Sequence, residues 1–473
     1  MKMSRVLGMI LASAVVTSAA TLTSAAAAGQ KPAATQSGAS QLKVVNQSVV
    51  IDGASISLKS VTVNQVALYS LRDLAGGLGA SIKQSGTELT VTDSMGLHAV
   101  ILKAGAKSYR VDGSDAQFAV APQSVQGSLY VEPIALVNAL GGEALPDTGE
   151  IRSMARLSGQ FSAPLFDAAG NLLVTQEDAE IPQLIKIGKN GQYDVFSNNG
   201  NIVGAALSPD RTAAAFTDEN GALFLLNMGN GTVKRLGTDT SVKTDLTWSA
   251  DGKKIYFIQG DKQEKIAYIS LDEAKVTEVL ADKVENKSEV QVSADGKKLV
   301  YFVTATGKAE TDKEGTEGSL TIDYSKAGTQ AFSLEKLGNK EAKPVQLTKD
   351  QDNKLYLSIL PDGSASYISA DPEGQLQNSV LKLISPDGTK ISNLVADVDV
   401  VSSEVIGGKL MILAEDANGC HLFEVAPAGA KTELFGTKAA VSEWAVAADG
   451  TIAVIADGKV ILVKDGKTTE LTK

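Results

Sequence analysis

Short apolar runs separated by polar turns fill the chain from about residue 161 to its end. A typical run is Lys254–Gln259, which follows the turn Asp251-Gly252 and precedes further apolar runs of similar length. Runs of about four to eight residues rich in Val, Ile, Tyr and Phe, bounded by Asp-Gly or Asn-Gly, predict β-strands joined by tight hairpin turns. This part of the chain, roughly two thirds of the whole, is therefore expected to be all-β.

The turn recurs at a regular interval. The stretch Trp248–Phe257 returns almost unchanged at Val292–Phe302, and the marker positions of all copies are 167, 210, 251, 295, 362, 407 and 449. Successive markers are 43, 41, 44, 67, 45 and 42 residues apart. A period of about 40–45 residues suits a four-stranded propeller blade, because one such unit has no partner for its apolar faces until units stack. The markers predict a β-propeller of seven blades, or of six if the unit at 167 or 407 is not a blade.

The expected strands are clearest in the third and the last unit. In the third unit they cover Asp245–Ser249, Lys254–Gln259, Lys265–Ser270 and Val276–Leu280. In the last unit they cover Ser442–Ala447, Ile452–Ala456, Val460–Lys464 and Thr468–Leu471.

The aspartate that recurs in the turns is expected to be structural, because its carboxylate can accept the turn's own backbone amides. Glycine suits the position after it, where tight hairpin turns require a positive φ. A ligand-binding role for the aspartate is the alternative. The residues assigned to these turns are Asp210, Asp251, Gly252, Asp295, Gly296, Asp362, Gly363, Asp449 and Gly450.

One interval between markers is 67 residues long, which indicates an insertion at about residues 305–328. We expect it between the second and third strands of its unit, on the propeller face that usually receives ligands. Because added loop length costs little entropy, the insertion is either a tolerated surface excursion or a partner-binding loop. The candidate binding residues are Glu310, Asp312, Lys313, Glu314, Asp323 and Tyr324.

A different pattern occupies residues 42–158. Leucines recur at helical spacing in residues 68–80 after a short strand, and Gly79 stands where a C-terminal cap is expected. A strand, a short helix and a glycine recur at residues 129–141, with Pro133 at a tolerated helix N-terminus. The two copies predict a small α+β domain with two related halves, followed by the all-β propeller at residues 159–473.

The first residues are typical of a secretion signal. Lys2 and Arg5 precede a short apolar run and a stretch of small residues that offers a cleavage site. The apolar run is too short for a membrane span. Residues 1–28 are therefore expected to be a signal peptide, and residues 29–41, rich in Ala, Gln, Ser and Gly, a flexible linker. The mature protein is expected to be secreted or extracellular, or retained at the cell wall, without a transmembrane anchor.

Composition and charge narrow the function classes. The 44 basic and 55 acidic residues give a net charge of −11, whereas a nucleic-acid surface needs a basic face, so no nucleic-acid partner is expected. With one cysteine, Cys420, the chain has no intramolecular disulfide, and its two histidines, His98 and His421, exclude a His-rich metal site. Cys420 and His421 adjoin on an expected strand and point to opposite faces, so no shared metal is expected. No cofactor is predicted.

The N-terminal pattern resembles a known family. Leu68–Val91 follows the strand–helix–hairpin pattern of the copper amine oxidase N-terminal-like family, with Ser70 where the family tends to carry proline. Leu129–Arg152 follows the same pattern loosely. The resemblance covers about a quarter of the chain and implies a stalk or binding module of bacterial surface proteins. It does not imply amine oxidation, because that reaction needs a copper site of several histidines.

The repeats resemble a second family. Ser249–Phe257 and Ser293–Phe302 are similar to the blade motif of TolB-like (WD-type) β-propellers, which carries Ser, Asp, Gly and Lys before an apolar strand. The resemblance covers roughly two thirds of the chain and implies a propeller fold. The six-bladed form of that family conflicts with the seven markers, which favour seven blades.

Leu145–Gly149 matches the sortase sorting pentapeptide Leu-Pro-x-Thr-Gly. A sorting signal lies near the C-terminus before an apolar stretch, whereas this pentapeptide is internal and falls where the repeated unit needs a hairpin turn. Because Pro-Asp-x-Gly is turn chemistry in its own right, we interpret the segment as a turn.

The sequence contains no recognised catalytic constellation: neither a Gly-x-Ser-x-Gly elbow nor a phosphate-binding Gly-x-x-x-x-Gly-Lys motif occurs. The leading hypothesis is a secreted or cell-envelope, non-enzymatic binding or scaffold protein, whose propeller is a platform for a protein or wall-glycan partner. The alternative is a propeller hydrolase or lyase acting on an extracellular polymer, which predicts carboxylates with raised pKa values at the channel mouth. A purely structural spacer is the third hypothesis.

Overall fold

The computed structural model describes residues 42–145, 148–188, 191–305, 308–311, 320–323, 327–339, 341–372, 374 and 378–473. The expected signal peptide and linker, residues 1–41, lie outside these ranges. Within them, no helix is long and apolar enough to cross a membrane. The described part is mostly β, with two α-helices of seven residues each.

Two sheets and two short helices make up residues 45–152. The first sheet has the strand order β11-β12-β1-β2-β3-β10-β9, and the second runs from β4 to β8 in chain order. Apolar residues of both sheets and both helices, among them Leu58, Leu74, Val100 and Leu136, form one core. The first sheet comprises β1 (Val45–Ile51), β2 (Ala54–Val63), β3 (Val66–Ser70), β9 (Gln123–Val125), β10 (Ser128–Val131), β11 (Glu143–Ala144) and β12 (Ile151–Arg152). The second comprises β4 (Ser81–Ser85), β5 (Glu88–Thr92), β6 (Ala99–Lys103), β7 (Ser108–Val111) and β8 (Ser114–Gln117); the helices are α1 (Leu71–Gly77) and α2 (Pro133–Ala139).

The expected strand–helix unit is present twice. β3 leads directly into α1, where the Asp73 amide donates to the Ser70 hydroxyl at 3.3 Å and caps the helix. β10 leads into α2, which begins with Pro133. Because β3 and β10 pair antiparallel, the two units lie side by side in one sheet. The hairpins that follow differ, since β4–β5 joins the second sheet and β11–β12 the first.

The pentapeptide Leu145–Gly149 lies in a turn between β11 and β12. The Gly149 amide donates to the Leu145 carbonyl at 2.8 Å, and the Leu145 amide donates to the Glu150 carbonyl at 2.8 Å. Pro146 and Asp147 themselves lie outside the described residues.

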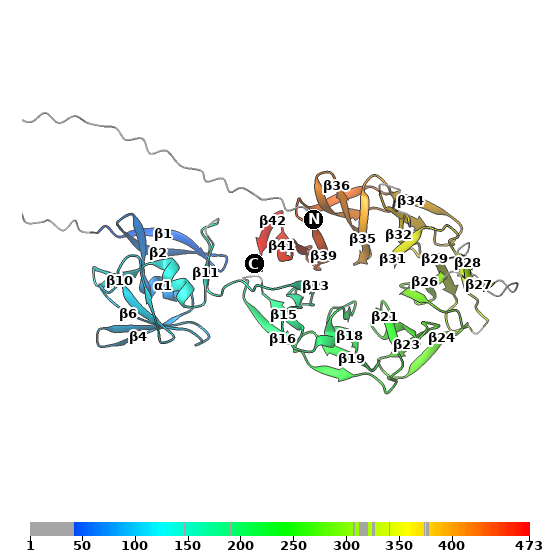
Figure 1. The fold of residues 1–473 in the computed structure, drawn as a ribbon, viewed down its shortest axis with the longest axis horizontal. Coiled ribbons are helices and arrows are strands. Elements are labelled where there is room, and N and C mark those ends of the chain that lie inside the picture. The colour runs from blue at the N-terminus through cyan, green and yellow to red at the C-terminus, as the bar shows by residue number, and fades with distance from the viewer. Residues whose placement is uncertain are drawn as a thin grey trace, which may run out of the picture. The chain divides into compact units, whose positions relative to one another are not determined.

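Seven four-stranded antiparallel sheets follow one another through the described part of residues 161–470. Each is built from four strands in chain order, and in the fourth sheet an extra hairpin separates the second strand from the third. The units marked at 167 and 407 each form such a sheet, β13–β16 and β35–β38. Figure 1 shows the sheets arranged around a ring, which makes the fold propeller-like.

The strand bounds of the first four sheets are β13 (Phe161–Phe166), β14 (Leu172–Gln176), β15 (Gln183–Ile187), β16 (Tyr193–Ser197); β17 (Ala206–Leu207), β18 (Ala213–Thr217), β19 (Leu223–Asn227), β20 (Val233–Arg235); β21 (Lys243–Trp248), β22 (Lys254–Gln259), β23 (Lys265–Ser270), β24 (Val276–Leu280); and β25 (Lys287–Val292), β26 (Lys298–Ala305), β29 (Gly328–Glu335), β30 (Val345–Gln346). Those of the last three are β31 (Asn353–Ile359), β32 (Ala365–Ala370), β33 (Val380–Ile384), β34 (Ile391–Val395); β35 (Asp399–Ile406), β36 (Lys409–Asp416), β37 (Gly419–Val425), β38 (Lys431–Thr437); and β39 (Val441–Val446), β40 (Ile452–Ala456), β41 (Lys459–Lys464), β42 (Lys467–Glu470). A 3₁₀ turn, Gly200–Ile202, precedes β17.

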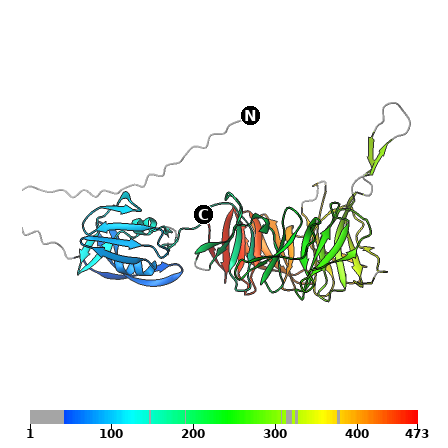
Figure 2. The ribbon, with the colours of Figure 1, turned by 90° about the horizontal axis from the view of Figure 1, so that it is seen from below.

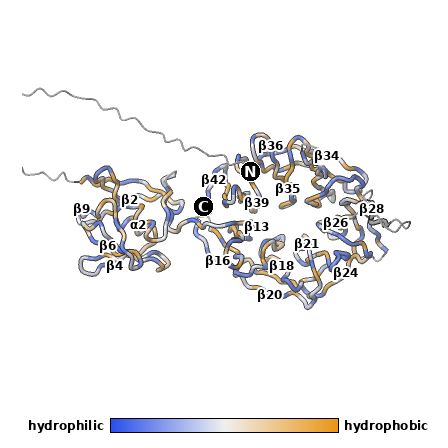
Figure 3. The backbone as a smooth tube through the Cα atoms, in the orientation of Figure 1, coloured by the Kyte–Doolittle hydropathy of each residue, from blue (hydrophilic) through white to orange (hydrophobic). Residues whose placement is uncertain are grey.

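Apolar layers between neighbouring sheets form the core of the ring. Between the second and third sheets, for example, Ala215, Trp248 and Phe257 pack in one cluster. In Figure 3 the hydrophobic stretches follow the strands, and the connections between strands are more hydrophilic. Because each sheet buries both faces only against its neighbours, the repeat predicted from the sequence requires this stacking.

The first and last sheets meet without sharing a strand. β13 contacts β39, and apolar residues of both sheets, among them Phe166 and Ile455, pack in one cluster. Leu157, just before β13, forms a parallel bridge with Thr472, and the Lys473 amide donates to the Leu157 carbonyl at 3.0 Å. Side-chain packing, this bridge and the hydrogen bond from the Ala163 amide to Glu443 join the two ends of the repeat array.

The turn aspartates accept hydrogen bonds from their own turns. Asp251 accepts the Ser249 hydroxyl at 2.7 Å and the Lys253 amide at 3.1 Å, and the hydrogen bond from Ser249 lowers the pKa of Asp251. Asp210, Asp295, Asp362 and Asp449 likewise accept the amide two residues on, and Asp449 also accepts the Lys464 ammonium. Gly252, Gly296, Gly363 and Gly450 have φ between 68° and 85°. In the first sheet Asp167 stands at the position of Ser249 instead, and accepts the amides of Ala169 and Asn171.

Three buried lysines repeat in register, and sequence inspection did not single them out. Lys243, Lys287 and Lys354 each stand eight residues before the turn aspartate of their unit, at 251, 295 and 362. The Lys287 ammonium donates to the Asp282 carboxylate at 2.7 Å, the Glu264 carbonyl at 2.9 Å and the Val284 carbonyl. Each lysine thereby ties the connection between two sheets to the start of a first strand.

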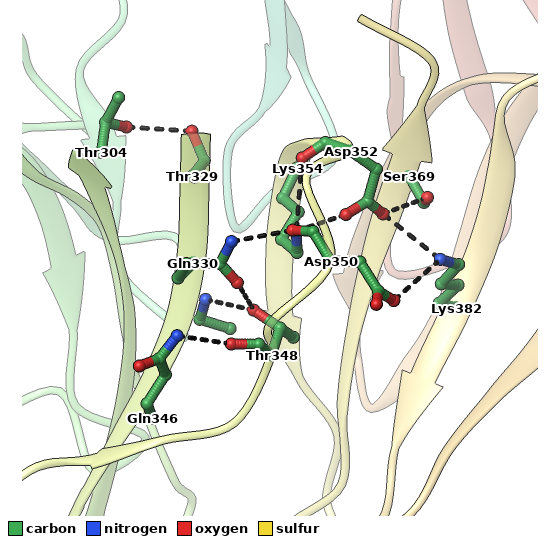
Figure 4. Close-up of polar contacts among 11 residues, drawn as sticks. Thr304, Thr329, Gln330, Gln346, Thr348, Asp350, Asp352, Lys354, Ser369 and Lys382 are labelled. Carbon is green, nitrogen blue, oxygen red and sulfur yellow. Dashed lines mark hydrogen bonds and ion pairs between the residues drawn. The ribbon is translucent and has the colours of Figure 1, made fainter. Parts of the chain in front are cut away.

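Figure 4 shows the network around the third of these lysines. Lys354 donates to Asp352 and to the Asp350 carbonyl, and Asp352 also accepts the Ser369 hydroxyl and the Lys382 ammonium. Burial opposes ionisation of Asp352, but the hydrogen bonds from Lys354 and Ser369 outweigh it and lower the pKa of this carboxyl. Opposite charges are therefore paired in this cluster, which holds the connection between two sheets in place.

Candidate binding site in the central channel

An irregularity repeats in the first strands of the sheets, which contact one another around the ring. In six of the seven sheets, the register between the first and second strands shifts at a bulge. At four bulges a residue other than glycine has positive φ: Ala163, Asp245, Glu289 and Tyr356, at 48–56°. A bulge leaves an amide outside the ladder and redirects the local side chains. In Figure 1 the first strands, among them β13, β31, β35 and β39, lie on the inner side of the ring, so residues at this level face its central channel.

A cavity of about 400 Å³ opens at this level. Its walls come from β13, β25, β31, β35 and β39, the first strands of five sheets. Three carboxylate side chains line it, those of Glu289, Glu404 and Glu443. The volume lies in the lower part of the range of small-ligand pockets, about 300–1,000 Å³.

Two of the carboxylates bond to a bulge on the next sheet. Glu289 accepts the Leu357 amide at 2.5 Å, and Glu443 accepts the Ala163 amide at 2.6 Å. Burial raises the pKa of Glu289 above its usual value and nearby Asp245 adds to this effect, while the Leu357 and Tyr356 amides oppose it. These carboxylates thus join neighbouring sheets and also face the cavity.

Glu404 differs, because its carboxylate has no hydrogen-bond partner among the described residues. Its side chain is exposed to the channel. Because protein surrounds the channel, the carboxyl has less bulk water around it than on an outer surface, and this desolvation raises the pKa of Glu404. The Arg211 guanidinium lowers that pKa in part; Arg211 itself donates to the Val446 carbonyl at 2.8 Å. Three carboxyl groups line the cavity and one guanidinium lies nearby, so acidic groups outnumber basic ones there.

Hydroxyls and aromatic rings complete the walls. The Trp444 indole donates to the Ser402 hydroxyl at 3.0 Å, and Tyr356 is 44% exposed. Ser358 is buried at 7% exposure and lines the cavity, and within the described residues its hydroxyl has no hydrogen-bond partner. The site thus combines carboxylates, an available hydroxyl and two aromatic faces.

Sequence inspection missed the channel residues, although a signal was present. Asp245, Glu289, Tyr356 and Glu443 each stand six residues before the turn aspartate of their unit. A large polar side chain at this fixed offset in four units would have marked the position. However, side chains alternate between the two faces of a strand, and a bulge shifts this alternation. The sequence alone therefore does not tell which face these residues occupy.

The insertion lies where the sequence predicted it. β26 pairs directly with β29, and the intervening segment forms the separate hairpin β27 (Lys308–Thr311) and β28 (Leu320–Asp323), which projects from one face of the ring (Figure 2). Of the candidate residues, Glu310 lies in β27 and Asp323 in β28. Asp312, Lys313, Glu314 and Tyr324 lie outside the described residues. The structure therefore leaves the partner-binding interpretation of this loop untested.

Cys420 and His421 point to opposite faces of β37, as predicted. Cys420 packs in the apolar cluster between the last two sheets, and His421 lies between Glu433 at 2.7 Å and Asp416 at 3.2 Å. Within the described residues, no group of three His, Cys, Asp or Glu side chains is placed to hold a metal ion.

His421 makes stability depend on pH. The hydrogen bond to Glu433 raises the pKa of His421, burial opposes this, and Asp416 adds to the increase. A folded-state pKa above the unfolded value of about 6.5 gives stabilisation that is full below that value and lost as pH rises through the folded-state pKa. We therefore expect His421→Gln to lower the urea unfolding midpoint more at pH 5.5 than at pH 8.5. An equal decrease at both values would contradict this assignment.

Comparison with known proteins identifies the N-terminal domain. Residues 42–151 match the family described as Copper amine oxidase N-terminal domain. The histidines present do not fit a copper centre, because His98 pairs with Asp112 at 2.9 Å and His421 lies on a different domain between two carboxylates. A search of curated proteins gives no match.

Solved structures similar to the chain are β-propeller proteins. Oligogalacturonate lyase in complex with manganese is 12% identical with a TM-score of 0.46, covering 67% of this chain and 86% of that chain. TolB from Acinetobacter baumannii is 14% identical with a TM-score of 0.35, covering 74% and 77%. The β-propeller domain of the Trilobed protease from Pyrococcus furiosus, described as having an open velcro topology, is 12% identical with a TM-score of 0.44, covering 67% and 97%. These similarities carry no argument about function.

Proposed function

We propose that this protein is a secreted or cell-envelope, non-enzymatic binding protein. Its seven four-stranded sheets act as the blades of one propeller, and the ring is a rigid platform whose channel receives part of a protein or wall-glycan partner. The copper amine oxidase N-terminal domain serves as a spacer or stalk that carries this platform.

The cavity at the bulges is the observation that carries the proposal. It gathers carboxylates, hydroxyls and aromatic rings from five sheets at one level, so a ligand there touches side chains that lie far apart in the sequence. Such a convergence of a few polar groups in a concave site is typical of ligand binding. Glu289 and Glu443 are held by amides of the neighbouring sheet, which fixes them before a ligand arrives.

The raised pKa values of Glu289 and Glu404 favour a second candidate function, a hydrolase or lyase acting on an extracellular polymer. A carboxyl whose pKa is raised by burial can act as a general acid beside an ionised one. Measurable turnover of a polysaccharide substrate, abolished in Glu289→Gln or Glu404→Gln, would favour this function over binding alone.

Thermal unfolding of residues 29–473 tests the proposed function. The protein is heated with wall-glycan fragments, with fractions of an envelope extract, and with calcium in the presence and absence of EDTA. Binding to the folded state raises the unfolding midpoint by mass action. A shift with a glycan or protein fraction is the expected result. A shift with calcium alone, lost in EDTA, favours a metal-dependent enzyme, and no shift in any sample favours a structural spacer.

A further inference from the structure

We propose that the channel cavity binds a lysine or arginine side chain of a protein partner, with the cationic head among Glu289, Glu404 and Glu443. This inference rests on the proposed binding function and adds the chemistry of the ligand. It is carried by the charge of the cavity, the spacing of its carboxylates, the free hydroxyl of Ser358 and the apolar residues at the channel's rim.

The charge of the cavity selects a cation. Three carboxylates line it, Asp245 lies at the same level of β21, and the nearby Arg211 provides one positive charge. Glu289 and Glu443 accept amides of the next sheet, and the Glu404 carboxylate has no hydrogen-bond partner among the described residues. Carboxylates enclosed by protein attract a cation more strongly than carboxylates in bulk water, because the medium screens them less.

The spacing of the carboxylates favours an organic cation over a metal ion. A bound metal needs several ligands around one point, and no such group is present among the described residues. An ammonium or guanidinium group instead carries several N–H donors, so it can bond to acceptors that lie apart in the cavity. The buried Ser358 hydroxyl, which has no partner in the described part of the chain, supplies a further acceptor in the same cavity.

The rim of the channel favours a protein as the source of this cation. Two kinds of connection lie at the same end of each sheet, because its strands are antiparallel and consecutive. One joins the second strand to the third, and the other leads to the next sheet. Glu289 and Glu443 are third in their strands and lie near that end. Large apolar side chains are exposed in these connections of the first four sheets, of which the first and the fourth also line the cavity: Ile181, Val203, Val242 and Val284. Apolar side chains beside a polar centre are typical of protein interfaces and suit a glycan less well.

Binding can be followed through Trp444, which lines the cavity. Trp248→Phe removes the other tryptophan of the chain, so that all indole emission comes from Trp444. The probes are two blocked peptides, Gly-Val-Lys-Val-Gly and Gly-Val-Arg-Val-Gly, together with the same lysine peptide acetylated on its side chain, and oligomers of glucosamine and of N-acetylglucosamine. Each probe is titrated at low and at high NaCl concentration.

We expect saturable binding of the cationic peptides, weakened at least tenfold by lysine acetylation and at least tenfold by Glu404→Gln. Glu404→Gln should fold normally, because the Glu404 carboxylate holds no other described residue. Glu273→Gln, a change in the β23–β24 turn, is the matched control and should bind as the parent does. High salt should weaken binding of the cationic peptides.

Three results would overturn the inference. If the acetylated peptide binds as well as the free lysine peptide, or if Glu404→Gln binds unchanged, the cation is not what the cavity recognises. If the glucosamine oligomers bind and the peptides do not, the partner is an amino glycan and the assignment to a protein is wrong. If only uncharged glycans bind, or an envelope fraction still shifts the unfolding midpoint while no cationic probe binds, the cation inference fails and the proposed binding function stands.

Discussion

Lys287→Met should lower the free energy of unfolding of the propeller by about 3–5 kcal/mol, the usual cost of removing one member of a buried ion pair. Lys287 has 0% exposure, and its ammonium bonds to the Asp282 carboxylate and to the carbonyls of Glu264 and Val284. Methionine fills much of the same volume but removes the ammonium donor from these three acceptors, and loss of a buried hydrogen-bond partner is costly.

The matched control is Lys297→Met. Lys297 is a neighbour in sequence and its side chain is 79% exposed, with Asp295 at 3.6 Å. An exposed ion pair contributes little to stability, so this variant should unfold at nearly the parental midpoint. Urea unfolding followed by circular dichroism compares the variants. Similar midpoints for Lys287→Met and Lys297→Met would show that the buried lysines do not hold the sheets together.

Trp248→Ala should cost about 3–5 kcal/mol, the range found for truncating a buried aromatic side chain. Trp248 is 8% exposed, packs with Ile255 and Phe257 between the second and third sheets, and donates its indole N–H to the Ala206 carbonyl at 2.8 Å. The substitution opens a cavity between two sheets and removes a hydrogen bond that joins them.

Trp444→Ala is the comparison. Trp444 also donates its indole N–H to the preceding sheet, to Ser402, but it is only half-buried and lines the channel. Thermal unfolding should therefore show a smaller decrease for Trp444→Ala than for Trp248→Ala. The reverse order would mean that the channel wall, and not the layer between sheets, carries the stability of the ring.

The sequence predicted the repeat well because its signals are local. Asp-Gly turns and apolar runs gave three of the four strands of the third unit with their observed bounds, Lys254–Gln259, Lys265–Ser270 and Val276–Leu280. The first strand of that unit was displaced by two residues at its start, since it begins at Lys243, and a lysine does not look like the beginning of a buried strand. Its partners, Asp239 and the Gly221 and Ser241 carbonyls, come from connections that a linear pattern does not bring together.

The site was harder to predict than the fold. Charged residues such as Glu289 and Glu404 look like solvated strand positions in a sequence, because nothing local distinguishes a channel from an outer surface. The partners of the channel carboxylates on the neighbouring sheets lie far along the chain, 68 positions away for Glu289 and Leu357 and 280 for Glu443 and Ala163. The two short helices predicted in the N-terminal domain are present, each seven residues long, because leucine spacing and a terminal glycine are local signals.

Hydrogen–deuterium exchange tests the central claim, that the channel of the propeller is the binding site. Residues 29–473 are compared alone and with the envelope fraction or peptide that gives the largest thermal shift. The account predicts that slowed exchange is concentrated in β25, β31, β35 and β39, whose residues line the cavity. Protection confined to residues 42–151, or to the outermost strands of the sheets with the channel strands unchanged, would contradict it.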